Sequence, residues 1–221
     1  MRVRDIEKEA RLILGQSDQA NSRWGSDTFL VWMNDGLERI CIEAEALIQD
    51  FFGDATIGRA EYPLPREAMA ILEIRFDNRR LKKVSKAELD GLDASWLTRE
   101  PGTPKAYYHD RIIGQDKTLS LYPAPAEVKP ITIKCLMRPT LLTGSEAIPE
   151  IPEEYHRVLV PYLVYRAYSE FGTESELRLA SIYMNEFAGR LKSMKQKLML
   201  EDRDTPLEFR LAPDVHRRNG I

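Results

Sequence analysis

The chain has 221 residues, of which 43% are hydrophobic and 30% are charged, and its net charge is −3. This composition is typical of globular proteins and excludes a chain that is disordered throughout, while the small negative charge excludes a bulk attraction for nucleic acid or an anionic membrane. No apolar run approaches the ~20 residues of a membrane span, and the N-terminal sequence has too many scattered charges for a signal peptide.

The first two predicted elements are amphipathic helices. Apolar residues at steps of three and four predict a short amphipathic helix that ends at Gly15; these residues are Val3, Ile6, Ala10 and Ile13. After a polar loop, Ser26 is expected to cap a longer helix, because its hydroxyl can accept a bond from a free backbone amide of the first turn. Residues 1–56 are therefore assigned to the N-terminal helices of a bundle. The apolar stripe of the second helix comprises Phe29, Met33, Leu37, Ile40, Ala44, Leu47 and Phe51.

From about Ile57 the apolar period changes to two, which predicts strands. Asp77-Asn78 is typical of a turn, and prolines fall at the ends of the alternating runs, where a missing ladder donor does least harm. Residues 57–143 are expected to form an inserted antiparallel β-sandwich or open barrel, with a short helix or structured loop at residues 86–97. The alternating runs lie at residues 72–76, 118–121 and 131–135.

Two further helices are predicted in residues 144–200. The first follows Pro152 and is apolar on most sides, so we expect it to be the most buried helix, bent where Pro161 frees the carbonyl of Arg157. Thr173 and Glu176 predict a capping box for the last helix. Its heptad-like stripe, which favours packing against another helix, comprises Leu177, Ala180, Met184, Phe187, Leu191, Met194 and Leu198.

The last predicted segment, residues 201–221, has no helical or strand period of useful length. It contains mixed charges, two prolines and scattered apolar residues, so it cannot bury enough surface to fold alone. Leu207, Phe209 and Leu211 nevertheless make it more than a solvated tail. An extended C-terminal arm that becomes ordered against another subunit agrees with both observations, and the fold class is therefore α+β with such an arm.

The run YYHDR at residues 107–111 has the side chains of a proton-transfer site, but the alternation of side chains along a strand argues against such a site. In a strand, His109 and Asp110 point to opposite faces and cannot form the dyad that base catalysis needs. His156 has no accompanying nucleophile, and His216 lies in the C-terminal segment. Glu153-Glu154 suits the positive end of a helix dipole. The sequence matches no catalytic, cofactor or metal motif, so we predict a protein that is not an enzyme and has no cofactor.

The cysteines and the basic clusters have simple structural explanations. Cys41 and Cys135 lie in apolar periodic stretches and are expected to be buried thiols, although the sequence leaves a disulfide between them open. A solvated surface is favoured over nucleic-acid binding for the basic residues, because exposed aromatic residues do not alternate with them. These residues are Arg79, Arg80, Lys82 and Lys83, and Arg190, Lys192, Lys195 and Lys197.

The order of several stretches resembles the head-to-tail connector proteins of tailed bacteriophages, the tail tubular protein A-like or gatekeeper-like adaptors. These stretches are RWGSDTFLVWMNDGLERI, AEYPLPREAMAILEIRFDNRRLKKVS, WLTREPGTPKAYYHDRIIGQDKTLSLYPAPA and IPEEYHRVLVPYLVYRAYSEFG. They cover nearly the whole chain, and none of them is a catalytic signature. The succession of GTPKAYY, LYPAPA and IPEEYH is the part most specific to this group.

The resemblance implies a bundle of about four helices carrying the β-domain and assembled as a ring, usually twelve-fold, in the neck or tail of the virion after assembly in the host cytoplasm. It also implies a portal protein above, a tail or nozzle protein below, and genomic DNA passing through the channel without sequence-specific binding or a membrane partner. Leu207, Phe209 and Leu211 are the predicted apolar anchors of the portal-docking arm.

A ligand- or carbohydrate-binding module in the β-domain is the alternative prediction. It would require Trp96, Tyr107 and Tyr108 to be exposed as a stacking platform for a sugar ring.

Overall fold

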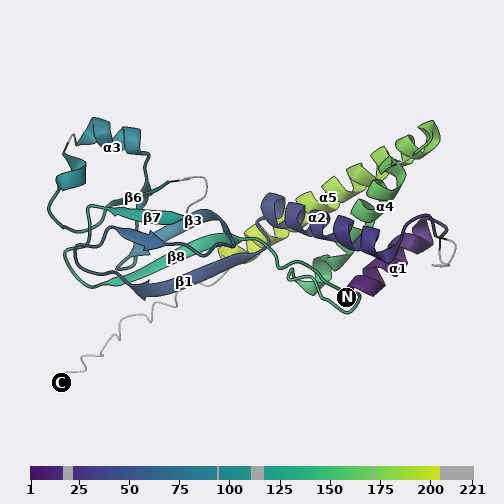
Figure 1. Cartoon of the computed structure of the whole chain (residues 1–221), viewed down its shortest axis with the longest axis horizontal. Coiled ribbons are helices and arrows are strands. Elements are labelled where there is room, and N and C mark those ends of the chain that lie inside the picture. The colour runs from purple at the N-terminus through teal and green to yellow at the C-terminus, as the bar shows by residue number, and fades with distance from the viewer. Residues whose placement is uncertain (17–21, 94, 111–116, 171, 205–221) are drawn as a thin grey trace, which may run out of the picture.

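The structure is a computed structural model that describes residues 1–16, 22–93, 95–110, 117–170 and 172–204. Figure 1 shows an elongated molecule with helices α1, α2, α4 and α5 at one end and the strands, together with α3, at the other. The fold is therefore α+β, as predicted. No helix in the described part of the chain is both long and apolar enough to span a bilayer.

The helical part is built around α4. Helix α1 spans Val3–Ile13, α2 spans Ser26–Ala44, α4 spans Leu159–Glu170 and α5 spans Glu174–Asp204. A 3-10 helix, η3, at Glu153–Val158 leads directly into α4, which contacts α1, α2 and α5. This confirms the prediction of a central helix, whose buried residues are Leu159, Val160, Pro161, Tyr162, Leu163, Val164 and Ala167.

The strands form two sheets. In the first, the order is β1 (Ile48–Asp54), β8 (Pro130–Met137), β3 (Ala68–Phe76) and β4 (Arg79–Arg80). In the second, it is β2 (Glu61–Pro63), β7 (Thr118–Tyr122), β6 (Ala106–Asp110) and β5 (Lys82–Lys83). One apolar cluster joins them, with Ile74 and Ile133 from the first sheet and Leu119 and Leu121 from the second. The described strands do not close into a barrel.

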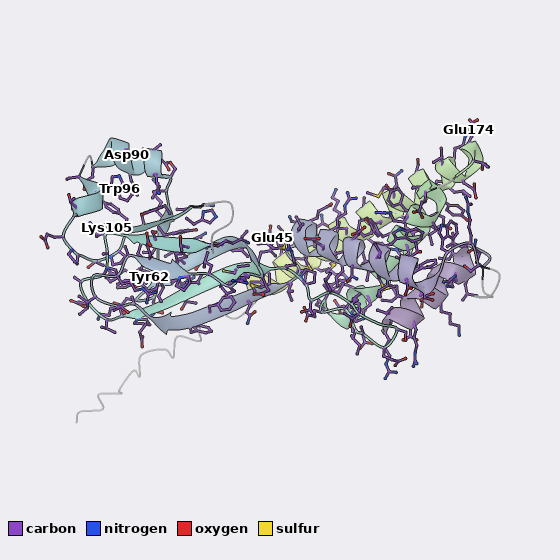
Figure 2. All side chains as sticks on the ribbon, in the orientation of Figure 1. Glu45, Tyr62, Asp90, Trp96, Lys105 and Glu174 are labelled. Carbon is purple, nitrogen blue, oxygen red and sulfur yellow. The ribbon has the colours of Figure 1, made fainter. Side chains whose placement is uncertain are left out.

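A small subdomain covers one side of the second sheet. Helix α3 spans Lys86–Leu92, and a 3-10 helix, η2, spans Trp96–Thr98. Ser85 and Glu88 form a capping box at the start of α3, since each side chain bonds the other's backbone amide. Trp96 lies below α3 near the labelled Asp90 (Figure 2) and packs with Val84, Leu89 and Ala106.

Three predicted helix details are wrong. Helix α2 ends at Ala44 because Glu45 adopts a left-handed conformation, with φ 54°, and the chain then enters β1. Leu47 and Phe51 are therefore not helical, and the strands begin at Ile48 rather than near residue 57. Ser26 is the first residue of α2 and does not cap it, because the N-cap is Gly25 and makes no side-chain bond. Leu177 of α5 is also exposed.

Two other corrections concern strand direction and Pro161. Strands β5 and β6 are parallel, although the remaining pairs between named strands are antiparallel as predicted. Pro161 lies in the first turn of α4, where a missing amide is tolerated. The Arg157 carbonyl four residues earlier accepts a bond from the Arg190 guanidinium of α5 at 3.1 Å. The chain thus uses the freed carbonyl to join η3 to α5.

Two local predictions are confirmed. Asp77 and Asn78 both have positive φ, at 49° and 62°, and form the turn between β3 and β4. The Thr173 hydroxyl accepts from the Glu176 amide, and the Glu176 carboxylate accepts from the Thr173 amide at 2.7 Å, which completes the capping box of α5. The bonds from Thr173 hold the pKa of Glu176 below its usual value.

Candidate functional site

The YYHDR run is part of a packed hairpin. Strand β6 pairs antiparallel with β7, with His109 opposite Leu119, as the sequence predicts; Arg111 is outside the described residues. Tyr107 is 3% exposed in the core between the sheets, and burial raises the pKa of its phenol. Tyr108 packs edge-on against Trp96, with ring centroids 5.3 Å apart.

This packing removes the alternative of a sugar-binding platform. Trp96 is only 9% exposed, and its indole N–H donates to the Asp90 carboxylate at 2.6 Å. With Tyr107 also buried and only Tyr108 partly exposed, the three rings do not form a joint platform on which a planar ligand could stack. The prediction that Trp96, Tyr107 and Tyr108 are jointly exposed is therefore wrong, because Tyr107 points into the core between the sheets while Trp96 and Tyr108 pack together beside α3 on the other face.

His156 is a buried structural residue, as predicted. Its ring is 1% exposed, and Nε2 lies 2.9 Å from the carbonyl of Ile151. Because a carbonyl can only accept, Nε2 carries the hydrogen, and Nδ1 accepts from the amine of Met1 at 2.8 Å. The same amine donates to Glu153 at 3.0 Å and lowers the pKa of that carboxyl. His216 is outside the described residues.

Both cysteines are free and buried, in different parts of the molecule. Cys41 lies in the helical core and Cys135 in the core between the sheets, so no disulfide joins them. Burial, with smaller contributions from the charges of Glu150 and Glu38, raises the pKa of Cys41 to about 12. Burial also raises the pKa of Cys135. Neither thiol has the character of a nucleophile, and the described residues contain no group of ligands that could hold a metal ion.

A buried ion pair in the helical part was missed by the sequence analysis. Glu7 and Arg11 of α1 are 4% and 3% exposed, and the Arg11 Nε donates to Glu7 at 2.7 Å. The other guanidinium nitrogens donate to the hydroxyl of Ser22 and to the carbonyl of Trp24, the latter at 3.0 Å. Ser26 donates to Glu7 at 2.8 Å. The pair thus anchors the α1–α2 connection to α1 and has a structural role.

Helix α2 presents an exposed face that mixes apolar and acidic residues, here called the α2 stripe. Val31 is 59% exposed and Ile42 is 48% exposed, while the opposite face of the helix is buried. Steps of four, three and four residues put all members on one face. Asp35 and Glu38 keep part of their surface in solvent despite intramolecular pairing. The α2 stripe comprises Val31, Asp35, Glu38 and Ile42.

A second surface, the η3–α5 groove, is an open concavity of about 630 Å³ between η3 and α5. Val158, Gly189 and Met194 form its floor, and Arg157, Arg190 and Lys197 contribute cations to its rim. Val158 and Met194 are themselves buried, so the groove has an apolar base beneath charged edges.

The two basic clusters lie in different places and are partly paired. Arg79, Arg80, Lys82 and Lys83 are exposed on β4 and β5, where Arg80 lies 3.7 Å from Glu73. On α5, Arg190 pairs with Glu186 at 2.6 Å, and Lys195 lies 3.6 Å from Glu45. Pairing of this kind agrees with a solvated surface. The predicted anchors Leu207, Phe209 and Leu211 lie outside the described residues, which end at Asp204.

A family model described as SU10 adaptor protein matches residues 1–210. No curated protein matches the chain.

Proposed function

Since the chain belongs to the SU10 adaptor protein family, a family of phage head-to-tail adaptors, we propose that it forms a ring between the portal and the tail of the virion and lines the channel for DNA. The family assigns it a structural role in the phage and implies contacts with portal and tail proteins. Our proposal adds the closed ring, twelve-fold by resemblance, with genomic DNA passing through it.

The match over residues 1–210 is the observation that carries this proposal, because it spans both the helical and the strand part. The division of the subunit supports it. Helices at one end can pack against neighbouring copies, while the β-domain, proposed as residues 57–143 with its sheet continued back to Ile48, can face the next tail component. Residues 1–56 and 144–200 would supply the bundle, and residues 201–221 the arm that reaches the portal.

A structural role is also the one we propose for the candidate groups. His156, in η3, is buried and hydrogen-bonded to the Ile151 carbonyl, and both thiols are buried. The channel would then let DNA pass without binding it tightly or acting on it chemically. The net charge of −3 suits a wall that does not retain DNA, since contacts to phosphates slow sliding.

Electron microscopy of the purified chain, alone and mixed with the portal protein of its phage, tests the proposal. We expect rings that bind coaxially to the portal. Assembly from the purified proteins in solution serves as the test of the proposed assembly in the host cytoplasm. A protein that stays monomeric and never joins the portal would refute the ring. Retention of DNA by purified rings at physiological salt would refute the passive channel.

A further inference from the structure

The α2 stripe and the η3–α5 groove have complementary chemistry. The stripe has two exposed apolar side chains, Val31 and Ile42, with carboxylates between them. The groove has an apolar floor below three cations and two carboxylates; Arg190 is already paired with Glu186 of the groove and Arg157 with Glu9 of α1, so that Lys197 gives the rim an excess of positive charge only in part balanced by Glu154. A surface of the first kind gains from contact with a surface of the second kind, because apolar area is buried while opposite charges stay at the rim.

The groove also has room for a side chain. Gly189 lies in its floor, and a Cβ atom added there would meet nothing within 4 Å. The neighbouring Ser193 is small and exposed, so that one turn of α5 offers little bulk above Val158 and Met194. An incoming branched apolar side chain such as Ile42 can therefore enter the groove over Gly189 and Ser193 without displacing a large residue.

The two surfaces lie at the same level along the helices. At one end Arg23, before α2, lies 3.4 Å from Glu176 of α5, and at the other end Lys195 donates to the Glu43 carbonyl at 2.9 Å. Helices α2 and α5 therefore run in the same general direction, from the end near Glu174 toward the junction near Glu45, although they are inclined to one another (Figure 2). Because Lys195 lies beside Glu45, Ile42, three residues before Glu45, is level with the turn of α5 at residues 192–193.

The same count brings apolar residues together at the other end. Val31 falls level with residue 181 of α5, next to Ile182, which is 60% exposed. Rotation about a ring axis preserves the height and the radius of each residue. Two surfaces of one copy that lie at the same level along its helices therefore meet between adjacent copies, unless the helices run along the circumference of the ring. Two different patches on one subunit are what a head-to-tail, ring-closing contact requires.

We propose that the α2 stripe of one copy packs against the η3–α5 groove of the next copy, with Ile42 on the groove floor and Val31 against Ile182. Glu38 then faces the cationic rim near Arg190. This inference rests on the proposed ring, and it names the surfaces through which the ring closes.

Thiol cross-linking tests the contact directly. Single variants Ile42→Cys and Ser193→Cys are mixed, assembled with and without portal protein, and treated with a short bis-maleimide. We expect a covalent dimer only in the mixture, and a ladder of oligomers from the double variant Ile42→Cys/Ser193→Cys. The native Cys41 and Cys135 should not compete, because both are fully buried with raised pKa values.

The control is Ile148→Cys mixed with Ser193→Cys, since Ile148 is exposed to a similar extent but lies outside the stripe. Rings that form without a cross-link between positions 42 and 193 would overturn this contact and leave the proposed function standing. Cross-linking of the Ile42→Cys variant to the portal or tail protein alone would also overturn it, because the stripe would then serve a different partner. A chain that forms no ring with or without portal would refute both proposals.

A second measurement does not depend on added thiols. Ile42→Glu puts a carboxylate onto the apolar floor, so we expect loss of the rings in micrographs while the far-ultraviolet circular dichroism of the subunit is unchanged. Rings that persist in this variant would contradict the assignment of Ile42.

Discussion

At the scale of single residues, the Glu7–Arg11 pair shows how burial changes the value of a charge. Replacing Arg11 by alanine leaves the Glu7 carboxylate buried without its cation and also removes the bonds to Ser22 and Trp24. We expect the free energy of unfolding to fall by about 3–5 kcal/mol. Urea unfolding followed by circular dichroism measures this loss.

The matched control for this prediction is Arg178→Ala. Arg178 pairs with Glu174 at the same spacing and the same 2.7 Å, but the two side chains are 78% and 84% exposed. Its loss should cost only ~0.3–0.5 kcal/mol. Equal losses in the two variants would show that burial of Arg11 has no energetic consequence.

The sequence could not distinguish these two pairs. Both are a glutamate followed four residues later by an arginine, and that spacing is the same on a solvated face and in a core. Arg11 is buried because its guanidinium lies over the ring of Phe29, 4.5 Å from the centroid, and against the backbone of Trp24. Those contacts join separate helices and depend on tertiary packing, which local periodicity does not contain.

Asp93 provides a prediction about pH. Its carboxylate accepts bonds from Tyr122 at 2.8 Å, Arg99 at 2.7 Å and Ser95 at 2.9 Å, and these bonds, that from Tyr122 first, hold its pKa well below the usual range. A carboxyl whose pKa is lower in the folded state stabilises the fold above its unfolded pKa. This stabilisation disappears as the pH falls through ~4 toward the folded value.

We therefore expect Asp93→Asn to destabilise the protein at neutral pH, and the difference from the wild type to shrink as the pH falls below ~4. Urea unfolding at several pH values measures it. Tyr122→Phe, which removes one donor, should move the loss to higher pH. A difference that is the same at neutral and acid pH would mean that the Asp93 charge does not stabilise the α3 subdomain.

At the scale of whole elements, the packing of α2 on α4 depends on one glycine. A Cβ atom at Gly36 would lie 2.7 Å from the Tyr162 ring and 3.1 Å from Leu159. The Tyr162 ring cannot easily give way, because it is buried and packs on Phe187 with centroids 5.0 Å apart. Gly36→Ala should therefore destabilise the fold by about 1–3 kcal/mol through overpacking. Urea unfolding of the variant measures the loss.

Gly189→Ala provides a control of opposite sign. It lies in the middle of α5, where an added Cβ meets nothing, so the better helix propensity of alanine should stabilise the fold by about 0.5–1 kcal/mol. The free energies of unfolding of Gly36→Ala and Gly189→Ala, each compared with that of the wild type, test this difference in sign. If both change in the same direction, helix propensity rather than the contact with Tyr162 governs position 36.

The end of α2 explains why helix boundaries were harder to predict than helix existence. Leu47 and Phe51 continue the helical spacing of the α2 core residues, although Glu45 has already ended the helix. Phe51 instead follows the two-residue period of a strand, because in β1 it lies opposite Ile133 and packs on the core between the sheets. The same residue fits both patterns, and only the pairing of β1 with β8 distinguishes them.

At the scale of the whole molecule, the order of helices, strands and helices was predictable, since each part has its own apolar period. The division of the strands into two sheets was not, nor was the parallel pairing of β5 with β6. Both depend on residues far apart in the chain. The proposed assembly surfaces were also missed, because an exposed Val31 or Ile42 looks like any other apolar residue of a helix until its burial is known.

The C-terminal arm is the part of the chain whose loss should separate folding from assembly. The sequence predicts that residues 201–221 become ordered only against another subunit, so deletion of residues 205–221 should leave the free energy of unfolding of the isolated chain unchanged. If Leu207, Phe209 and Leu211 are the portal anchors, changing all three to serine should abolish co-sedimentation with the portal protein, because a few apolar anchors carry most of a binding energy. Val215→Ser is the control, and portal binding that survives the triple change would place the docking residues elsewhere.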